Sequence, residues 1–428
     1  MSTKRTLLDK VSESIQEYCS EFHNYQFDSA NPAVKLHEPT FSNEEIFAAT
    51  KVMLSTFVTQ GANVKGFEKE YAKYTACKYG VMCNSGSSAN LLAVAALCNP
   101  ATQDGLKPGD EVIVPALSWS TTVWPLIQLG LIPVIVDIDP DTLNIDPNEI
   151  LKAINPRTKA VMLVHVYGNP CDMDAICSIC DKHQLILIED SCESMGASYD
   201  GKPVGSIGRV GTFSTYFSHH ISTLEGGVCV TNDNDLSDLM RILRAHGWVR
   251  EIEDSKKYTE LHPSIDPRFL FVNIGYNLRA TEAQAAMGLI QLPKLDQFVD
   301  SRRQGGQFWT EEIKKYGDVL TVQDETPKSK HSWFGIPLTI KHEAPFTMKD
   351  LRDFFETHNI ETRPIICGNI AIQPAMKMYQ HKVEGGLNFA NNVLQNSFSF
   401  GNHQWVNQEA RDYIAHVLYT FMREHGVA

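Results

Sequence analysis

Short runs of hydrophobic residues alternate with longer amphipathic segments in the first half of the chain. The runs EVIVPA (111–116), PVIVDID (133–139), AVMLVHV (160–166) and LILIED (185–190) are apolar at consecutive positions. Strands of this kind are buried on both faces, and the helical segments between them supply the layers that cover them. The pattern predicts an α/β fold with a mixed, mostly parallel sheet flanked by helices. Ligands of such sheets gather at the carboxyl ends of the strands.

Regions with a different pattern flank this alternating part. Residues 1–40 contain an amphipathic helix followed by an irregular aromatic segment, and we expect them to form a docking arm. A large domain is expected over residues 41–295. Near residue 296 a long polar helix leads into a further strand and helix, which predicts a smaller C-terminal α/β domain over residues 296–428.

The charge and cysteine content narrow the possible functions. The 38 Lys and Arg against 51 Asp and Glu give a net charge of −13, and no basic run points to a nucleic-acid partner. The longest apolar stretches are less than half of the ~20 residues that a membrane span requires. The ten cysteines are scattered, as in reduced cytosolic proteins, and the N-terminus lacks the apolar core of a signal peptide. We therefore expect a cytoplasmic protein with no membrane and no nucleic-acid partner.

A segment of small polar residues opens a predicted helix. Residues 84–90 read Asn-Ser-Gly-Ser-Ser-Ala-Asn and precede the helix-forming run LLAVAALC. The free amides, hydroxyls and positive dipole end of such a helix suit a phosphate group. Taken alone, the segment is more typical of a plain serine-capped helix.

Two further side chains are expected at the same edge of the sheet. Asp190 ends the run LILIED, and Trp119 follows the run EVIVPA. A carboxylate there suits the protonated ring nitrogen of a cofactor, and an aromatic face suits a planar ring. Each residue alone is more often a helix cap or a core residue, but together with residues 84–90 they indicate a single site.

The segment from Gly211 to Gly227 resembles the sequence signature of a known protein family. It reads GTFSTYFSHHISTLEGG and resembles the signature F-S-x-x-x-x-K-x-x-x-x-x-E-G-G of the PLP-dependent nucleotide-sugar aminotransferase and dehydratase family of fold type I. Six residues before Glu225, where the family's Schiff-base lysine stands, this sequence has His219. Imidazole is not a primary amine and cannot form a Schiff base. The departure resembles the 3-dehydratases of 3,6-dideoxysugar synthesis.

Cysteine positions separate two kinds of 3-dehydratase. One kind resembles this chain at Cys192 but carries an iron–sulfur cluster held by three more cysteines beyond the active-site histidine. This chain has no cysteine between residues 230 and 366, and the usual cluster needs four thiolates. The C-x₂-C spacing of Cys177 and Cys180 is zinc-like, but these residues suit core positions of an amphipathic helix better. We therefore expect no metal.

Beyond the arm, nearly the whole chain resembles the cluster-free 3-dehydratases that act on GDP-4-keto-6-deoxymannose. The shared text includes VPALSWSTT, LIEDSCESMGA, RAHGWVR, GYN.R and TRPI. The resemblance implies PLP and its amine form PMP as cofactors and L-glutamate as amino donor. It also implies loss of the C3 hydroxyl from a nucleotide-linked 4-keto-6-deoxy sugar, in a homodimer with shared active sites. A sugar 4-aminotransferase, a 3-dehydratase of a GDP-heptose and an inactive PLP-binding homologue remain alternatives.

The resemblance also assigns residues to the cofactor. It implies phosphate contacts from the small residues, ring stacking from the tryptophan and a bond from the carboxylate to the pyridine nitrogen, while the glutamate positions the cofactor or a water. An asparagine is implied to reach the phosphate from the other subunit. The residues assigned in this way are Gly86, Ser87, Trp119, Asp190, Glu193, Ser214 and Asn277.

Histidines and one arginine are assigned to the chemistry and the substrate. His219 would take a proton from C4′ of the cofactor and give one to the departing hydroxyl, a pair of transfers that suits a pKa near neutrality. The six-residue spacing favours His219 over the adjacent His220, because neighbouring residues point in different directions. His246 and Arg250 are candidate substrate contacts, and a local ion pair at a helix end explains them equally well.

Overall fold

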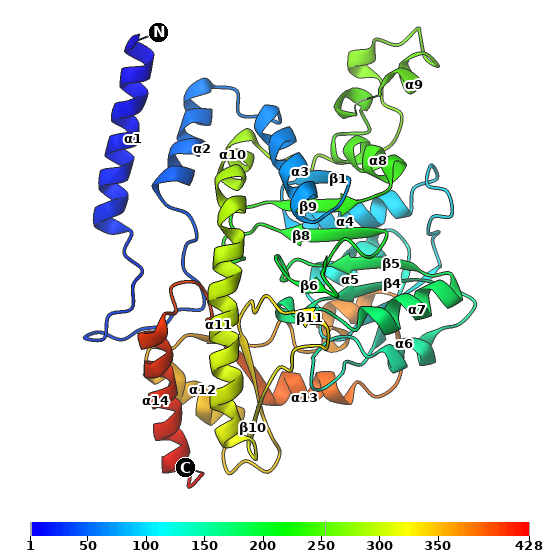
Figure 1. Cartoon of the computed structure of the whole chain (residues 1–428). Coiled ribbons are helices and arrows are strands. Elements are labelled where there is room, and N and C mark those ends of the chain that lie inside the picture. Colours follow the sequence, from blue (N-terminus) through cyan, green and yellow to red (C-terminus); the bar gives the residue numbers. More distant parts are fainter. Residues whose placement is uncertain (1, 253, 428) are drawn as a thin grey trace.

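An eight-stranded sheet forms the centre of the computed structural model, which describes residues 2–252 and 254–427 (Figure 1). In spatial order its strands are β1 (Tyr79–Cys83), β9 (Gly227–Thr231), β8 (Val210–Ser214), β5 (Ile186–Asp190), β4 (Thr158–Val164), β2 (Glu111–Pro115), β3 (Ile132–Val136) and β14 (Lys382–Val383). All neighbours from β8 to β14 are parallel, and β9 runs antiparallel to both β1 and β8. The expected mixed, mostly parallel sheet of an α/β fold is confirmed.

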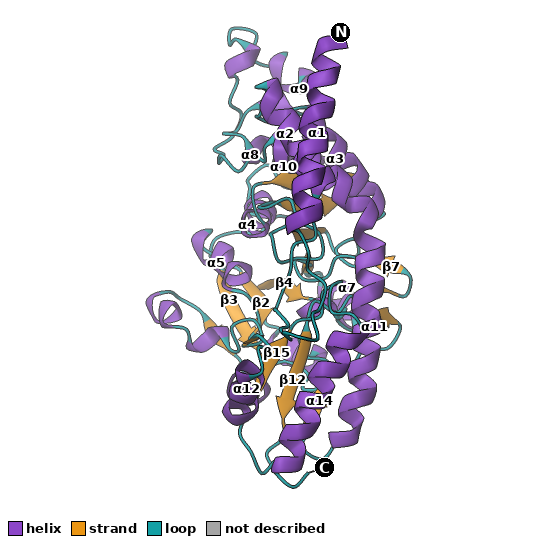
Figure 2. Ribbon diagram, turned by 90° about the vertical axis from the view of Figure 1, so that its left-hand side faces the viewer, coloured by secondary structure: helices purple, strands orange, loops and turns teal. Residues whose placement is uncertain are grey.

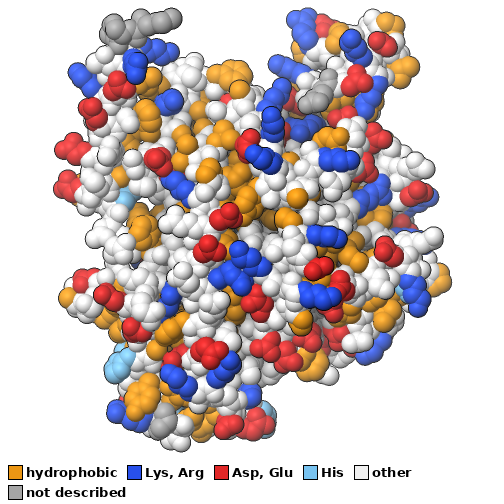
Figure 3. Space-filling model, viewed as in Figure 1, with side chains coloured by type: hydrophobic (Ala, Val, Ile, Leu, Met, Phe, Trp, Pro, Cys, Tyr) orange, Lys and Arg blue, Asp and Glu red, His pale blue; other side chains and the backbone are white. Residues whose placement is uncertain are grey.

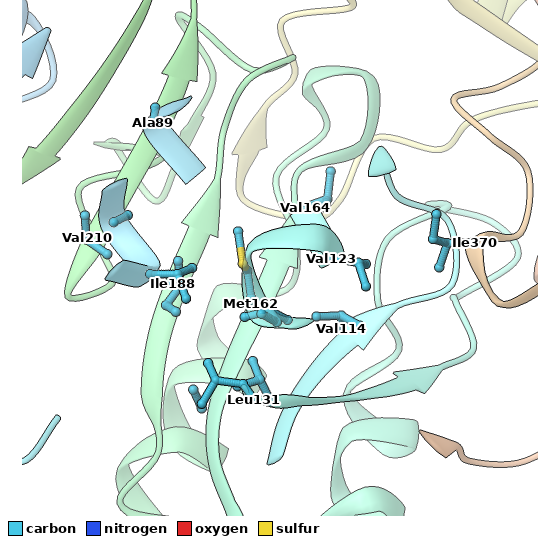
Figure 4. Close-up of a cluster of buried hydrophobic side chains, with 14 of the residues drawn as sticks. Ala89, Val114, Val123, Leu131, Met162, Val164, Ile188, Val210 and Ile370 are labelled. Carbon is cyan, nitrogen blue, oxygen red and sulfur yellow. The ribbon is translucent and has the colours of Figure 1, made fainter. Parts of the chain in front are cut away.

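Helices cover both faces of this sheet, because successive side chains of a strand point to opposite faces. On β4, Met162 and Val164 belong to the cluster of hydrophobic side chains drawn in Figure 4. Val161 and Leu163 of the same strand belong to a separate cluster on the other face. The first face is covered by α4 (Gly86–Leu97), α5 (Ser120–Gln128) and α8 (Asn234–Arg244), and the second by α6 (Pro147–Ala153) and α7 (Met173–His183).

A second, antiparallel sheet forms a separate hydrophobic core. Its strands, in order, are β10 (Leu320–Val322), β12 (Ile336–Ile340), β15 (Ser397–Phe400) and β13 (Thr362–Arg363). The helices α11 (Leu295–Ile313), α12 (Met348–Thr357) and α14 (Gln408–Glu424) pack against it.

The division at residue 296 stays a prediction. The segment after β13 contains η6 (Ile370–Ile372), η7 (Pro374–Met378) and α13 (Asn388–Asn396), and its side chains Ile365, Met376 and Val393 pack in the core of the large sheet. Part of the C-terminal region therefore lies with the large sheet, which β14 also joins.

The N-terminal arm begins with a helix that stands at the edge of the molecule (Figures 1 and 2). This helix, α1 (Ser2–Phe22), lies against α2 (Asn43–Ser55), which contacts α10 (Glu282–Gln291), as does α3 (Ala62–Tyr74). Between the first two helices the chain is held on the second sheet's core, since Val34 forms a bridge with Ile360 and the Lys35 carbonyl lies 3.2 Å from the His403 ring.

The remaining elements are short. A small sheet contains β11 (Ser329–Lys330), β6 (Ser198–Tyr199) and β7 (Lys202–Pro203). The short helices are η1 (Val166–Gly168), η2 (Val249–Glu251), α9 (Lys256–Thr259), η3 (Pro267–Phe269), η4 (Leu292–Lys294) and η5 (Lys314–Tyr316). Among residues 2–252 and 254–427, no helix is both long and apolar enough to cross a membrane.

Candidate active site

A cavity of about 340 Å³ opens where β5 and β8 end at their carboxyl edge. The strands and helices that build it come from the large sheet, and the loop and strand carrying Phe334 and Arg363 close it from the second sheet. Seven of the ten residues assigned from the sequence line it, namely Gly86, Ser87, Trp119, Asp190, Glu193, Ser214 and His219.

The first turn of α4 forms one wall of the cavity. The Ser85 hydroxyl caps this helix by accepting a hydrogen bond from the Ser88 amide at 3.0 Å. A Cβ atom at Gly86 would lie 2.5 Å from Cβ of Ser214 and 3.1 Å from Sγ of Cys192, so only glycine permits this close approach. The helix start, the Ser87 hydroxyl and the space beside them suit a phosphate group.

The carboxylate of Asp190 is buried at the end of β5 and is held by neutral donors. Its Oδ2 accepts hydrogen bonds from Nδ2 of Asn90 and Oγ1 of Thr122, both at 2.8 Å, and its Oδ1 accepts one from the Cys192 amide at 3.2 Å. Asn90 is itself fixed by the hydroxyl of Thr212, which donates to its Oδ1 at 2.6 Å. These bonds orient the carboxylate without neutralising it, which suits a positively charged pyridine nitrogen.

The two adjacent histidines lie in different environments. The His219 ring lines the cavity, 5.2 Å from the ring of Phe334 and 6.0 Å from that of Tyr216, and its buried Nδ1 has no hydrogen-bond partner among the described residues. His220 is fully buried, and its Nε2 lies 3.2 Å from the Ser332 carbonyl. The structure thus brings His219, and not His220, to the cavity.

Burial makes His219 a weak base. Desolvation lowers its pKa to about 3, and the positive charges of Arg363 and Arg302 act in the same direction. The expectation of a pKa near neutrality is therefore wrong for this protein. The imidazole is neutral at pH 7 and has a free nitrogen ready to accept a proton.

A glutamate and an arginine lie beside each other in the wall of the cavity. Oε1 of Glu193 lies 3.7 Å from the guanidinium of Arg363, and its Oε2 accepts a hydrogen bond from the Tyr167 amide at 3.2 Å. Burial raises the pKa of Glu193 to about 6, although Arg363 and the amide oppose the shift. Arg363 also lies over the rings of Tyr167 and Phe334, at 5.8 and 5.5 Å.

Several residues of the site were missed by the sequence assignments. Asn90 lies within the quoted segment 84–90, and Arg363 lies within the quoted text TRPI, so both were visible without being assigned a role. Thr122 lies in the same way within the quoted text VPALSWSTT. Phe334 carries no local signal, because an aromatic residue in a loop occurs throughout globular proteins.

Three assigned residues do not line this cavity: Asn277, His246 and Arg250. Oδ1 of Asn277 accepts a hydrogen bond from Nε of Arg279 at 3.0 Å, and a terminal nitrogen of Arg279 lies 3.2 Å from Nε2 of His246. Arg250 lies over the Trp248 ring at 5.9 Å. Their predicted roles toward cofactor and substrate stay predictions.

The cysteines are free thiols. Cys180 is buried on α7, and Cys177 on the same helix is half-buried. Over residues 2–252 and 254–427, no three His, Cys, Asp or Glu side chains are grouped so that they would hold a metal ion.

Comparison with known proteins gives three specific likenesses. Residues 39–419 match the model of the DegT/DnrJ/EryC1/StrS aminotransferase family. The GDP-4-keto-6-deoxy-D-mannose 3-dehydratase of Yersinia pseudotuberculosis is 41% identical over 373 residues, which are 86% of this chain and 94% of that protein. A solved GDP-4-keto-6-deoxymannose-3-dehydratase with a trapped PLP-glutamate geminal diamine is 38% identical, with a TM-score of 0.82 over 90% of this chain and all of that one.

A further relative extends the match into the arm. The dTDP-4-dehydro-2,6-dideoxy-D-glucose 3-dehydratase of Saccharopolyspora spinosa is 33% identical over 425 residues, which are 97% of this chain and 92% of that protein. Because the match covers so much of the chain, it includes most of residues 1–40, for which the resemblance noted above gave no counterpart.

Proposed function

Because the chain belongs to the DegT/DnrJ/EryC1/StrS aminotransferase family, we propose that it is a PLP-dependent 3-dehydratase that removes the C3 hydroxyl of GDP-4-keto-6-deoxymannose, with L-glutamate as amino donor. One observation carries the proposal. His219, which stands at the motif position of the family's lysine, lines the cavity, and within the described part of the chain no lysine lines it. A site of this kind binds the cofactor without a covalent bond and still supplies an acid/base group.

The residues present fit PLP and PMP. The start of α4 with Gly86, Ser87 and Ser214 would hold the phosphate, Asp190 the pyridine nitrogen and Trp119 one face of the ring. When bound, the cofactor supplies an electron-withdrawing ring that stabilises charge at the carbon next to its amine. The close approach of Gly86 to Ser214 and the neutral donors on Asp190 are the features that support this fit.

His219 would act first as a base. Its imidazole is neutral at pH 7, so it would accept a proton from C4′ of the cofactor and, once charged, would donate one to the hydroxyl leaving C3. Burial and the nearby guanidiniums of Arg363 and Arg302 make the charged form short-lived and favour the second transfer.

Arg363 would bind a carboxylate of L-glutamate. Its guanidinium lines the cavity, and the fork of donors matches a carboxylate bidentately. Glu193 lies 3.7 Å away and would hold this arginine in place until the donor arrives.

A homodimer with shared sites is part of the proposal. Asn277, His246 and Arg250 do not line the cavity of their own chain, which supports placing them at the site of a second subunit. We also propose a cytoplasmic location, which the ten free thiols support.

The test is the product formed from a panel of GDP- and CDP-linked 4-keto sugars, including a GDP-heptose. Each sugar is incubated with the protein, PLP and L-glutamate, and the product is identified by mass while ammonia is measured. Release of ammonia with a 3-deoxy-4-keto product of the GDP-hexose is expected. A stable sugar amine would instead assign a 4-aminotransferase, and a cofactor that binds but does not react with glutamate would assign an inactive homologue.

A further inference from the structure

The outer face of α1 carries a continuous seam that no part of the chain covers within residues 2–252 and 254–427. Lys4, Leu7, Ser14, Tyr18 and Glu21 on this face are exposed, and the side chains of Leu7 and Tyr18 are 58% and 59% exposed. Val11, between them, lines with Leu7, Ser14 and Tyr18 a groove of about 550 Å³ that reaches Ile46 of α2. The neighbouring face of α1 turns toward α2, where Cys19 is buried at the side of this groove.

The spacing of the seam is that of a helix that packs against another helix. Its positions 4, 7, 11, 14, 18 and 21 follow one another at alternating intervals of three and four residues. This repeat keeps one stripe facing a partner helix along the whole length, here about 26 Å. The two ends of the stripe are charged, and its middle is made of small and apolar side chains.

The charges of α1 are distributed in a way that disfavours the helix on its own. Lys4, Arg5 and Lys10 lie in the first half, and Glu13, Glu17 and Glu21 lie in the second half, with Asp9 as the single acidic residue of the first half. Basic residues at a helix N-terminus and acidic residues at its C-terminus oppose the helix dipole. Within residues 4–22, none of these side chains forms an ion pair elsewhere in the described chain.

The same distribution is complementary to itself when the helix is turned end to end. Pairing about a point between residues 12 and 13 sets Lys4 opposite Glu21, Leu7 opposite Tyr18 and Val11 opposite Ser14. A parallel pair would instead set Lys4 against Lys4 and Glu21 against Glu21. We therefore infer that α1 pairs in antiparallel fashion with α1 of a second copy of this chain, around a two-fold axis.

The pair would be one part of a larger contact. A two-helix seam of this length is small compared with a typical stable interface, which buries about 1,200 Å² or more in total. The seam therefore strengthens an assembly that other surfaces of the chain also hold, and its effect is measured as a change in the association constant.

The experiment exchanges the charges at the two ends of the seam. Lys4→Glu and Glu21→Lys each place like charges opposite one another in two symmetric contacts, and we expect association to weaken on the order of tenfold. The double variant Lys4→Glu/Glu21→Lys restores both contacts. A mixture of the two single variants also restores them, because the acidic seam of one matches the basic seam of the other.

Association is measured by sedimentation velocity over a range of protein concentrations, with the affinity tag at the C-terminus. Lys69→Glu, the same charge change on the exposed surface of α3, is the matched control and should associate like the unchanged protein. Far-ultraviolet circular dichroism verifies that α1 remains folded in each variant. Recovery in the double variant and in the mixture supports the pairing. Equal association of all variants, or a loss that the double variant does not reverse, overturns it and leaves the seam to another partner.

Discussion

Replacing Arg363 by glutamine tests how the two sides of the cavity interact. The guanidinium lies 3.7 Å from Oε1 of Glu193, and the arginine side chain is 35% exposed. Two unit charges at this distance attract by about 1 kcal/mol in water and about 4 kcal/mol at the effective dielectric of a protein surface. Because a third of the arginine is exposed, solvent screening favours the lower part of this range.

Loss of this attraction raises the pKa of Glu193 further above its present value of about 6. A change of about 1 to 4 kcal/mol alters the ratio of ionised to protonated carboxyl roughly fivefold to a thousandfold, so the protonated fraction of Glu193 at pH 7 should be larger in Arg363→Gln than in the unchanged protein. The same change removes one of the two guanidiniums that lower the pKa of His219. Both groups should therefore titrate at higher pH.

The assay follows the absorbance of bound PLP and the rate of its reaction with saturating L-glutamate as a function of pH. The transition assigned to Glu193 is identified by its disappearance in Glu193→Gln. Tyr167→Phe is the matched control, since it removes the hydroxyl that lies 3.3 Å from Nε of Arg363 but keeps the positive charge. A Glu193 transition that stays in place or moves to lower pH in Arg363→Gln would refute the reasoning.

Three further predictions concern the same site and its surroundings. His219→Lys should lose dehydration by about 10²- to 10⁴-fold and hold PLP covalently through denaturation, whereas His220→Lys should not acquire covalent PLP, and the opposite result would reverse their assignment. Asn90→Ala removes a hydrogen bond to a buried carboxylate and should weaken PLP binding about tenfold in a spectroscopic titration, with an unchanged dissociation constant contradicting the role of this network. Burial lowers the pKa of His219 and His403 to about 3, and it lowers those of His220 and His331 well below 6.5. At a pH between the native pKa of such a histidine and its unfolded pKa of about 6.5, the unfolded chain binds more protons than the native one. The free energy of unfolding should therefore fall as the pH drops below about 6.5, by about 1.4 kcal/mol per pH unit for each such histidine. Urea denaturation at several pH values should show that unfolding of His403→Gln takes up one proton less than unfolding of the unchanged protein.

The parts of the site that could be predicted from the sequence are those fixed by local pattern. Asp190 and Trp119 follow buried strands, and parallel strands end at a common edge, so their proximity follows from the hydrophobic runs alone. The place of His219 follows from its spacing to Glu225 within one segment. In each case the residue and the feature that positions it are close in the sequence.

The closing wall of the cavity could not be predicted in this way. Phe334 and Arg363 lie more than a hundred residues beyond His219, on a loop and a strand that belong to the second sheet. Their approach depends on how the two sheets are held together, which hydrophobic periodicity does not encode. The error about the pKa of His219 has a related origin, because desolvation by burial and the charge of Arg363, which lies on this wall, are the largest causes of the shift.

The surroundings of residue 219 would favour an uncharged base of any kind. Burial and the guanidiniums of Arg363 and Arg302 disfavour a positive charge there, and the same conditions would lower the pKa of a lysine amine and make it more nucleophilic. The environment therefore does not distinguish a dehydratase from an aminotransferase. The distinction lies in the side chain itself, because an amine in this position reacts with the aldehyde of PLP, while the imidazole of His219 can only exchange protons. The cavity therefore favours a neutral base in either case, and the side chain at position 219 alone decides whether PLP is bound covalently.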